Sequence, residues 1–199
     1  MKNVPFEAGA YYHVFNRGNN KENIFIEERN YYFFLRKLSL YLLPVLNVLS
    51  YCLLPNHFHL VIQFKEKRVL SEKYRTGKRK LHQPFSNFFN SYAKAFNKAN
   101  QRTGSLFQEH LPRIQIKDED YLRDVILYTH LNPENHGIIP DFQSYPYSSF
   151  SRILTGRSRI INCSEVLDWF GGKENFRYCH LYRRFRNEQK LEGMGRIDF

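Results

Sequence analysis

Two histidines one residue apart stand in an otherwise apolar stretch, LLPNHFHLVIQF at residues 53–64. In a β-strand, positions two apart share a face, so His57 and His59 point to one side while Phe58 and Leu60 point to the other. The apolar side fits packing against helices. Two imidazoles one strand repeat apart can hold a single divalent ion. A His-x-His pair alone is a weak signal, because two polar positions on a half-exposed strand give the same pattern.

A second candidate group lies in LYTHLNP, residues 127–133. Tyr128 and Asn132 are four apart, which on a helix places them on one face about 6 Å from each other. Beside a two-histidine metal site, the amide oxygen of Asn132 could be a third ligand and Tyr128 a nucleophile toward phosphate. The metal would neutralise charge at phosphorus and fix the line of attack. A phosphotyrosine would conserve the energy of the broken DNA link for rejoining.

The nucleophile must lose a proton during attack, because a tyrosine has a pKa near 10. The sequence identifies no base for it. Tyr121 shares the helix face of Tyr128 but lies about 16 Å along the axis from Asn132. Among the other histidines, His13 and His110 could also lie near the site, although lone histidines are more often residues of the surface or the edge of a core. His130 falls on a different helix face from Tyr128, which favours a structural role.

The composition predicts a polyanionic partner. The 199 residues include 30 Lys and Arg against 19 Asp and Glu, a formal charge of +11, and 17% are aromatic. A protein this basic usually meets nucleic acid. The run from 65 to 80 reads as a solvated basic loop or extended ribbon, and its position directly after the histidine strand suggests contacts with phosphates near the site. The candidate DNA contacts are Lys78, Arg79 and Lys80 in this loop, Arg17 and Asn19 in the turn after the first strand, and Arg183 and Arg184 in the tail, where capping of the sheet is an equal alternative.

Hydrophobic periodicity and turn residues predict an α+β protein. The expected order is a strand over 11–17, a helix over 27–43, strands over 47–53 and 53–64, a helix over 84–100, a strand over 112–117 and a helix over 118–132, which Pro133 should end. This order matches a ferredoxin-like βαββαβα sandwich with an antiparallel sheet, followed by a helical tail over roughly 164–192. We expect a catalytic domain over 1–152 and a basic helical extension over 153–199 that packs on or beside it.

The remaining features narrow the class of protein. The sequence has no run of 18 apolar residues and no signal-peptide core at its start, so we expect no membrane span and no secretion. Its three cysteines are widely spaced and form no C-x-x-C, which indicates reduced thiols in a cytoplasmic protein. We also expect the protein to be associated with the nucleoid.

The motifs together resemble the single-tyrosine His-hydrophobic-His transposases that act on single-stranded DNA, and most closely the REP-associated tyrosine transposases. The matching stretches are YYHVFNRGNNKENIF (11–25), LPNHFHLVIQ (54–63), YAKAFNKANQRTGSLFQEHLPRI (92–114), YLRDVILYTHLNPENHGII (121–139) and YPYSSF (145–150). The resemblance implies a metal-binding pair at His57 and His59, a third ligand at Asn132 and a nucleophile at Tyr128. It also implies Mg²⁺ or Mn²⁺, a covalent 5′-phosphotyrosine, and imperfect palindromes that fold into hairpins as the DNA partner.

Three functions compete for this sequence. The first is a metal-dependent strand transferase that cuts and rejoins single-stranded DNA through Tyr128. The second is a catalytically silent module, derived from such a transposase, that grips DNA or RNA hairpins. The third is a metal-dependent phosphodiesterase that uses water, for which Tyr128 would be dispensable. The complete set of His57, His59, Tyr128 and Asn132 favours the first, since a pure binder has no physical need for it. Relatives of this kind act as monomers or homodimers, and the sequence leaves both open.

Overall fold

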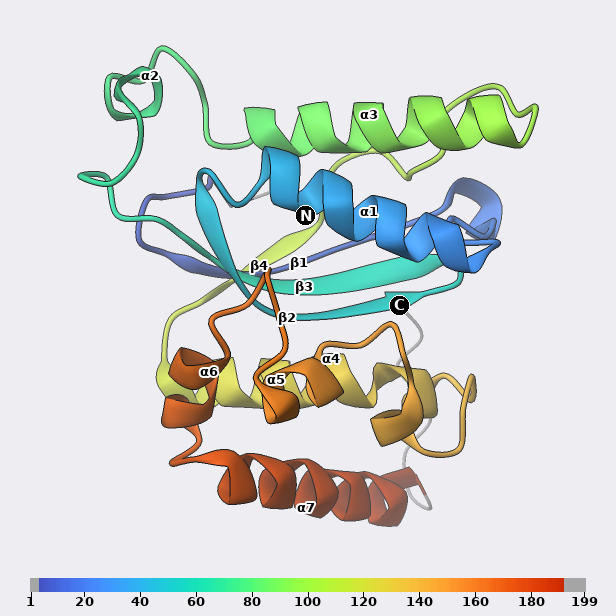
Figure 1. Cartoon of the computed structure of the whole chain (residues 1–199), viewed down its shortest axis with the longest axis vertical. Coiled ribbons are helices and arrows are strands. Elements are labelled where there is room, and N and C mark those ends of the chain that lie inside the picture. Colours follow the sequence, from blue (N-terminus) through green and yellow to red (C-terminus); the bar gives the residue numbers. More distant parts are fainter. Residues whose placement is uncertain (1–3, 192–199) are drawn as a thin grey trace.

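Four strands form one antiparallel sheet between two layers of helices (Figure 1). The structure is a computed structural model and describes residues 4–191, with side chains up to Arg183. Its elements are β1 (Tyr11–Arg17), a 3-10 turn (Asn19–Lys21), α1 (Glu28–Tyr41), β2 (Leu46–Leu54), β3 (His57–Phe64), α2 (Glu72–Arg75), α3 (Gln83–Ala99), β4 (Arg113–Ile116), α4 (Glu119–Asn135), a second 3-10 turn (Phe142–Ser144), α5 (Phe150–Thr155), α6 (Cys163–Trp169) and α7 (Lys173–Leu191).

The strand order is β2-β3-β1-β4, and every neighbouring pair is antiparallel. This order and the sequence of elements confirm the predicted ferredoxin-like α+β arrangement. The histidine strand β3 therefore lies in the middle of the sheet. Its register against β1 sets Phe15 opposite His59 and Arg17 opposite His57.

Helices α1 and α3 cover one face of the sheet, above it in Figure 1. The apolar side chains of β3 pack there against aromatic rings, as the ring of Phe58 does at 5.2 Å from that of Phe34. Phe34 in turn meets Phe88 edge-on at 4.8 Å. Such edge contacts add to the stabilisation that buried area alone gives. The apolar face predicted for the histidine strand is thus confirmed as the surface on which the helices pack.

Helix α4 lies on the opposite face and carries Tyr128 (Figure 1). It begins where the Asp118 carboxylate accepts a hydrogen bond from the backbone N–H of Tyr121 at 2.7 Å, an arrangement that satisfies a free amide and complements the helix dipole. The prediction that Pro133 ends the helix is wrong, because α4 continues to Asn135. Pro133 falls in the last turn, where its missing N–H removes a single bond and the burial of Leu131, Asn132 and Pro133 outweighs the loss.

The region predicted as one helical tail is divided. Helix α6 ends at Trp169, and α7 starts at Lys173 after Gly171 and Gly172, whose φ angles of 72° and 110° suit glycine. Helix α7 packs on α4 as the outermost layer of Figure 1. Helix α5 spans the expected domain boundary between residues 152 and 153, and the division of the chain there stays a prediction. The basic run over 65–80 contains one short helix, α2, where only loop or ribbon was predicted.

A buried chain of hydrogen bonds fastens α7 to the rest of the molecule. His180 Nδ1 lies 2.7 Å from the carbonyl oxygen of Phe176, which can only accept, so neutral His180 accepts at Nε2 from Nδ1 of His130 at 2.8 Å. His130 Nε2 then accepts from the hydroxyl of Ser149 at 2.7 Å, and that oxygen accepts from the Tyr51 amide on β2. Burial lowers the pKa of His180 to about 3 and that of His130 well below its usual value. The structural role predicted for His130 is consistent with this chain.

Replacing His180 by Asn is expected to lower the free energy of unfolding at pH 7 and to weaken its dependence on pH in the acid range. At pH 7 the loss leaves His130 without its partner, which costs about 1–3 kcal/mol. Below pH 6.5 a histidine in the unfolded chain binds a proton, whereas His180 in the folded protein stays neutral down to about pH 3 because its pKa is lowered. The free energy of unfolding of the wild type therefore falls as the pH decreases through that range. The variant lacks this contribution, and its curve should be shallower by up to about 1.4 kcal/mol per pH unit. Urea unfolding between pH 4 and 7 measures both effects, and parallel curves would contradict the assignment.

In residues 4–191, no helix is long and apolar enough to cross a membrane. Cys52, Cys163 and Cys179 are all free thiols.

Candidate active site

The two histidines of β3 face helix α4. The ring of His59 meets that of Tyr128 edge-on at 5.7 Å, and the ring of His57 meets that of His136 at 4.8 Å. The two imidazole centroids lie 5.3 Å apart. The strand therefore presents both histidines to the same side, as its alternation predicts.

Tyr128, Asn132 and His136 stand on successive turns of one face of α4. Because Tyr128 contacts His59 and His136 contacts His57, Asn132 falls on the turn between these two contacts. Asn132 is fully buried, and its Nδ2 donates to the carbonyl oxygen of Tyr128 at 2.9 Å. This bond leaves Oδ1 of the same amide as the atom available to a ligand. The structure thus brings the four predicted site residues together on one helix and one strand.

Two polar atoms at this place are buried without a hydrogen-bond partner, namely Nε2 of His59 and Oδ1 of Asn132. A buried polar atom left unpaired costs about 1–3 kcal/mol, so two such atoms beside each other indicate a ligand. The other ring nitrogen of His59 is occupied, since Nδ1 lies 3.0 Å from Nε2 of His13. Nδ1 of His57 lies 2.6 Å from Oδ1 of Asn56. Both histidines therefore keep Nε2 for a further partner.

Burial makes the histidines of the site neutral. It lowers the pKa of His57 to about 3, with the charges of His136 and Arg17 adding to the effect. It lowers the pKa of His59 well below its usual value and that of His13 to about 4. A neutral imidazole has the free lone pair that a metal ion needs.

These residues fit a divalent cation. His57 and His59 would supply imidazole nitrogens, and Asn132 would supply an amide oxygen. Among the described side chains there is no group of three His, Cys, Asp or Glu that could hold a metal. The amide oxygen of Asn132 would add a third donor to the two imidazoles. Imidazole nitrogens are ligands for first-row divalent metals, and the amide oxygen is the type of donor that Mg²⁺ and Mn²⁺ prefer.

Tyr128 is held as a neutral phenol. Its burial raises its pKa above the ordinary value, so a phenolate does not form at neutral pH without help. A cation close to the Tyr128 hydroxyl would stabilise the phenolate oxygen as the proton leaves.

A cleft of about 270 Å³ opens beside Tyr128. Sheet residues such as Phe15, helix α4 and Arg183 of α7 line it. Nη1 of Arg183 lies 2.9 Å from Oδ1 of Asp124, which tethers the guanidinium at the cleft. One predicted DNA contact is thus placed next to the candidate nucleophile. Tyr121, which spacing had set apart from Asn132, lines the same cleft.

The other candidate DNA contacts lie at separate places. Arg17 is half-buried and pairs opposite His57 in the sheet. Asn19 donates from Nδ2 to the carbonyl oxygen of Ser105 at 3.0 Å, so part of its amide already holds the 104–111 segment. The side chain of Arg184 lies outside the described residues. Their contacts with DNA stay predictions.

Lys78, Arg79 and Lys80 are exposed in the connection between α2 and α3. The basic segment leaves β3 at Phe64, whereas the histidines stand at the start of that strand. At about 3.3 Å per residue, roughly 23 Å of strand separates His57 from the start of the segment. A DNA contact by these side chains would therefore be made away from the metal site.

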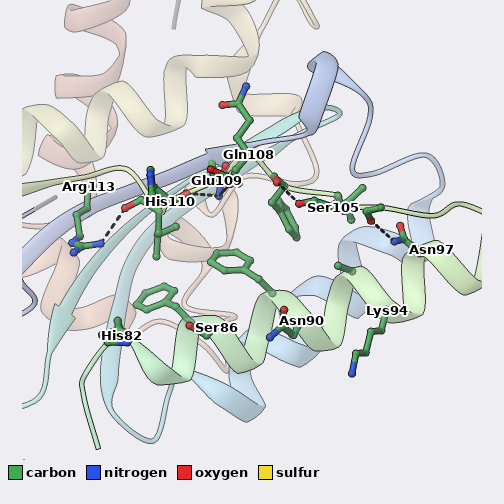
Figure 2. Close-up of a pocket in the computed structure, with 18 residues that line it drawn as sticks. His82, Ser86, Asn90, Lys94, Asn97, Ser105, Gln108, Glu109, His110 and Arg113 are labelled. Atoms are coloured by element: carbon green, nitrogen blue, oxygen red, sulfur yellow. Dashed lines mark hydrogen bonds between the residues drawn. The ribbon is translucent and has the colours of Figure 1, made fainter. Parts of the chain in front are cut away.

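A cavity of about 690 Å³ lies on the α3 side of the sheet. Figure 2 shows it between α3 and the segment over 104–113, with Ser86, Asn90 and Lys94 projecting from the helix and Gln108 and His110 from the segment. Phe89 contributes a half-buried ring to its lining. Strand β1 joins the two hollows, since Asn16 lines this cavity and Phe15 lines the cleft beside Tyr128.

Sequence reasoning missed two residues of the site, His136 and Asn56, and gave His13 only as a minor candidate. Only the strand register and the packing of α4 bring them to His59 and His57. The one available signal was alternation in YYHVF, which puts His13 and Phe15 on one face of their strand.

No protein-family model matches this chain. Over 103 residues the chain is 30% identical to a protein of Haemophilus influenzae named "Putative REP-associated tyrosine transposase". The match covers 51% of this chain and 57% of that protein, so it spans little more than half of the relative's length.

Among solved structures, the chain is similar in fold to that of a REP-associated tyrosine transposase bound to a REP hairpin. It superposes with a TM-score of 0.58 at 17% identity, over 80% of this chain and 88% of that one. At this identity the likeness concerns the fold. The two comparisons together confirm the resemblance that the sequence motifs predicted.

Proposed function

We propose that this chain, a relative of the REP-associated tyrosine transposases, cuts and rejoins single-stranded DNA at hairpins formed by imperfect palindromes. Tyr128 would be the nucleophile, and His57, His59 and Asn132 would hold Mg²⁺ or Mn²⁺. The observation that carries the proposal is the pair of unpartnered buried atoms, Nε2 of His59 and Oδ1 of Asn132, beside a tyrosine ring. Two unpaired buried polar atoms lower the stability of the fold, and a domain that only binds DNA would gain nothing from them.

The reaction follows from the residues in place. The bound cation would neutralise charge on the phosphate and orient it. The Tyr128 oxygen would attack phosphorus and lose its proton, while the bond from phosphorus to the 3′ oxygen breaks and that oxygen leaves as a 3′-OH. The product is a 5′-phosphotyrosine, and attack by a 3′-OH would reverse the step and rejoin DNA. Arg183 at the cleft would add positive charge near the phosphate.

Other features support a DNA hairpin as the partner. The chain carries a formal charge of +11, and phosphate contacts dominate binding to nucleic acid. The cavity of Figure 2 combines the half-buried ring of Phe89 with the amides of Asn90 and Gln108. Aromatic stacking beside amide groups is the usual means of holding unpaired bases. All four proposed site residues lie in one chain, so a monomer and each subunit of a homodimer would hold a complete site. We place the protein in the cytoplasm beside the nucleoid.

A strand-exchange assay tests this function. Hairpin strands taken from palindromes around the gene, with unpaired flanks, are incubated with the protein and Mg²⁺ or Mn²⁺, together with a second labelled strand. We expect cleavage and a joined product that carries sequence from both strands, and no product with EDTA. Tight binding without cleavage under either ion would favour the hairpin-binding module. Cleavage that yields a free 5′ phosphate and no joined product would favour hydrolysis by water.

The basic connection gives a separate prediction. Replacing Lys78, Arg79 and Lys80 together by Ala should weaken hairpin binding and reduce the slope of log affinity against log salt by about 2, because each lost phosphate contact removes about 0.7 from that slope on a single strand. The matched control replaces Arg36, Lys37 and Lys98, three basic residues on α1 and α3. Equal losses in both triple variants would show that the connection has no special role.

A further inference from the structure

We propose that His13 is a positioning residue for the metal site: it accepts the Nδ1 hydrogen of His59 and so turns the lone pair of His59 Nε2 toward the cation. This inference rests on the metal site proposed above. It adds a residue outside the four that the motifs predict. His13 stands on β1, one strand away from the histidine pair.

The contact between the two rings is close and shielded from water. Nε2 of His13 lies 3.0 Å from Nδ1 of His59. The rings stack at 5.2 Å with an interplanar angle of 23°, and their exposed fractions are 6% and 3%. A single hydrogen joins the two nitrogens, so one ring donates and the other accepts.

The direction of this bond decides whether His59 can bind a metal. If His13 donated, the hydrogen of neutral His59 would sit on Nε2, a buried atom with no hydrogen-bond acceptor, and no lone pair would remain for a ligand. If His59 donates from Nδ1, Nε2 carries a lone pair. Metal-bound histidines usually donate their other nitrogen to an acceptor that fixes the ring.

His57 shows the same arrangement with a simpler partner. Its Nδ1 lies 2.6 Å from Oδ1 of Asn56, an atom that can only accept. The orientation of that amide is supported by its Nδ2, which donates to the carbonyl oxygen of Lys21 at 3.4 Å. His57 therefore donates from Nδ1 and keeps the lone pair on Nε2. With His13 as the acceptor for His59, both histidines take the same ligating form.

The first test measures Mn²⁺ binding without DNA. His13→Met removes the acceptor at nearly constant size, and His13→Gln keeps an oxygen that can accept. We expect Met to weaken Mn²⁺ binding by about 10–100-fold, the usual effect of losing such a partner, while Gln stays within about threefold of wild type. His82→Met, at an exposed position, controls for loss of a histidine. Wild-type affinity in His13→Met, or equal losses in folded Met and Gln variants, would overturn the proposal.

The second test needs no variant. Nitrogen NMR of the histidine rings in the wild-type protein with Mg²⁺ shows which nitrogen of His59 carries hydrogen. We expect Nδ1 protonated and a change at Nε2 on adding Mg²⁺. A hydrogen on Nε2 in the Mg²⁺-bound protein would refute the role of His13 however the variants behave. The first test measures metal binding and the second measures the position of a hydrogen, and neither depends on strand transfer. The role of His13 can therefore be confirmed if strand transfer is not observed, and refuted if strand transfer is observed.

Discussion

Replacing Tyr128 by Phe is expected to abolish cleavage of hairpin DNA while leaving metal and hairpin binding unchanged. The change removes the attacking oxygen and keeps the ring that packs edge-on against His59. Removal of a nucleophile lowers turnover by about 10⁴-fold or more, which places the variant below detection in a gel assay. Initial rates on a labelled hairpin strand, with Mn²⁺ affinity measured in parallel, separate loss of chemistry from loss of the site.

The chain offers a matched control on the same helix. Tyr121 lines the same cleft and is 39% exposed, so Tyr121→Phe removes a comparable hydroxyl within the same walls. We expect it to retain activity within about tenfold of wild type. Full cleavage by Tyr128→Phe would point to water as the nucleophile. Loss of cleavage in Tyr121→Phe alone would identify Tyr121, seven residues earlier on α4, as the nucleophile.

Replacing Asn132 by Leu is expected to separate stability from function. The amide oxygen is buried without a partner, so the apolar replacement should leave the free energy of unfolding of the metal-free protein unchanged or raise it by about 1 kcal/mol. The same change removes a proposed metal ligand, and cleavage should fall by at least about 100-fold. Residues kept at a cost to stability are typical of functional sites.

Thermal unfolding with and without Mn²⁺ provides the control for this variant. A ligand that binds only the folded state raises stability by about 2.7 kcal/mol at 100 times its dissociation constant. We expect Mn²⁺ to raise the midpoint of the wild type and to leave Asn132→Leu unmoved. If the metal-free variant unfolds at a markedly lower temperature than the metal-free wild type, Asn132 stabilises the fold through contacts other than its hydrogen bonds. If Mn²⁺ raises the unfolding midpoint of Asn132→Leu as much as that of the wild type, Asn132 is not a metal ligand.

Local patterns in the sequence were enough to predict most of the fold. Alternation in the histidine strand assigns its two faces, and the apolar spacing of α1 and α3 identifies the side of the sheet they cover. The end of α4 was mispredicted because the local penalty of Pro133 is smaller than the burial of the last turn. The break between α6 and α7 was signalled by Gly171 and Gly172, a glycine pair at the point where the expected helix divides.

The candidate site was only partly predictable. Spacing joins His57 to His59 and Tyr128 to Asn132, because each pair belongs to one element. The partners that fix the ring of each histidine come from elsewhere: His13 reaches His59 through the register of β1 with β3, and Asn56 meets His57 at the turn before β3. Arg183 arrives at the cleft because α7 folds back onto α4. Contacts between distant segments depend on tertiary packing, which no short pattern encodes.

The central claim is that Tyr128 becomes covalently joined to DNA, and one measurement addresses it directly. Wild-type protein is incubated with a hairpin strand and Mn²⁺, denatured, digested with nuclease and protease, and its peptides are sequenced by mass spectrometry. The account predicts a nucleotide attached through its 5′ phosphate to the peptide that contains Tyr128, and no adduct with EDTA or in Tyr128→Phe. An adduct on another tyrosine, or cleaved DNA without any adduct, would contradict it.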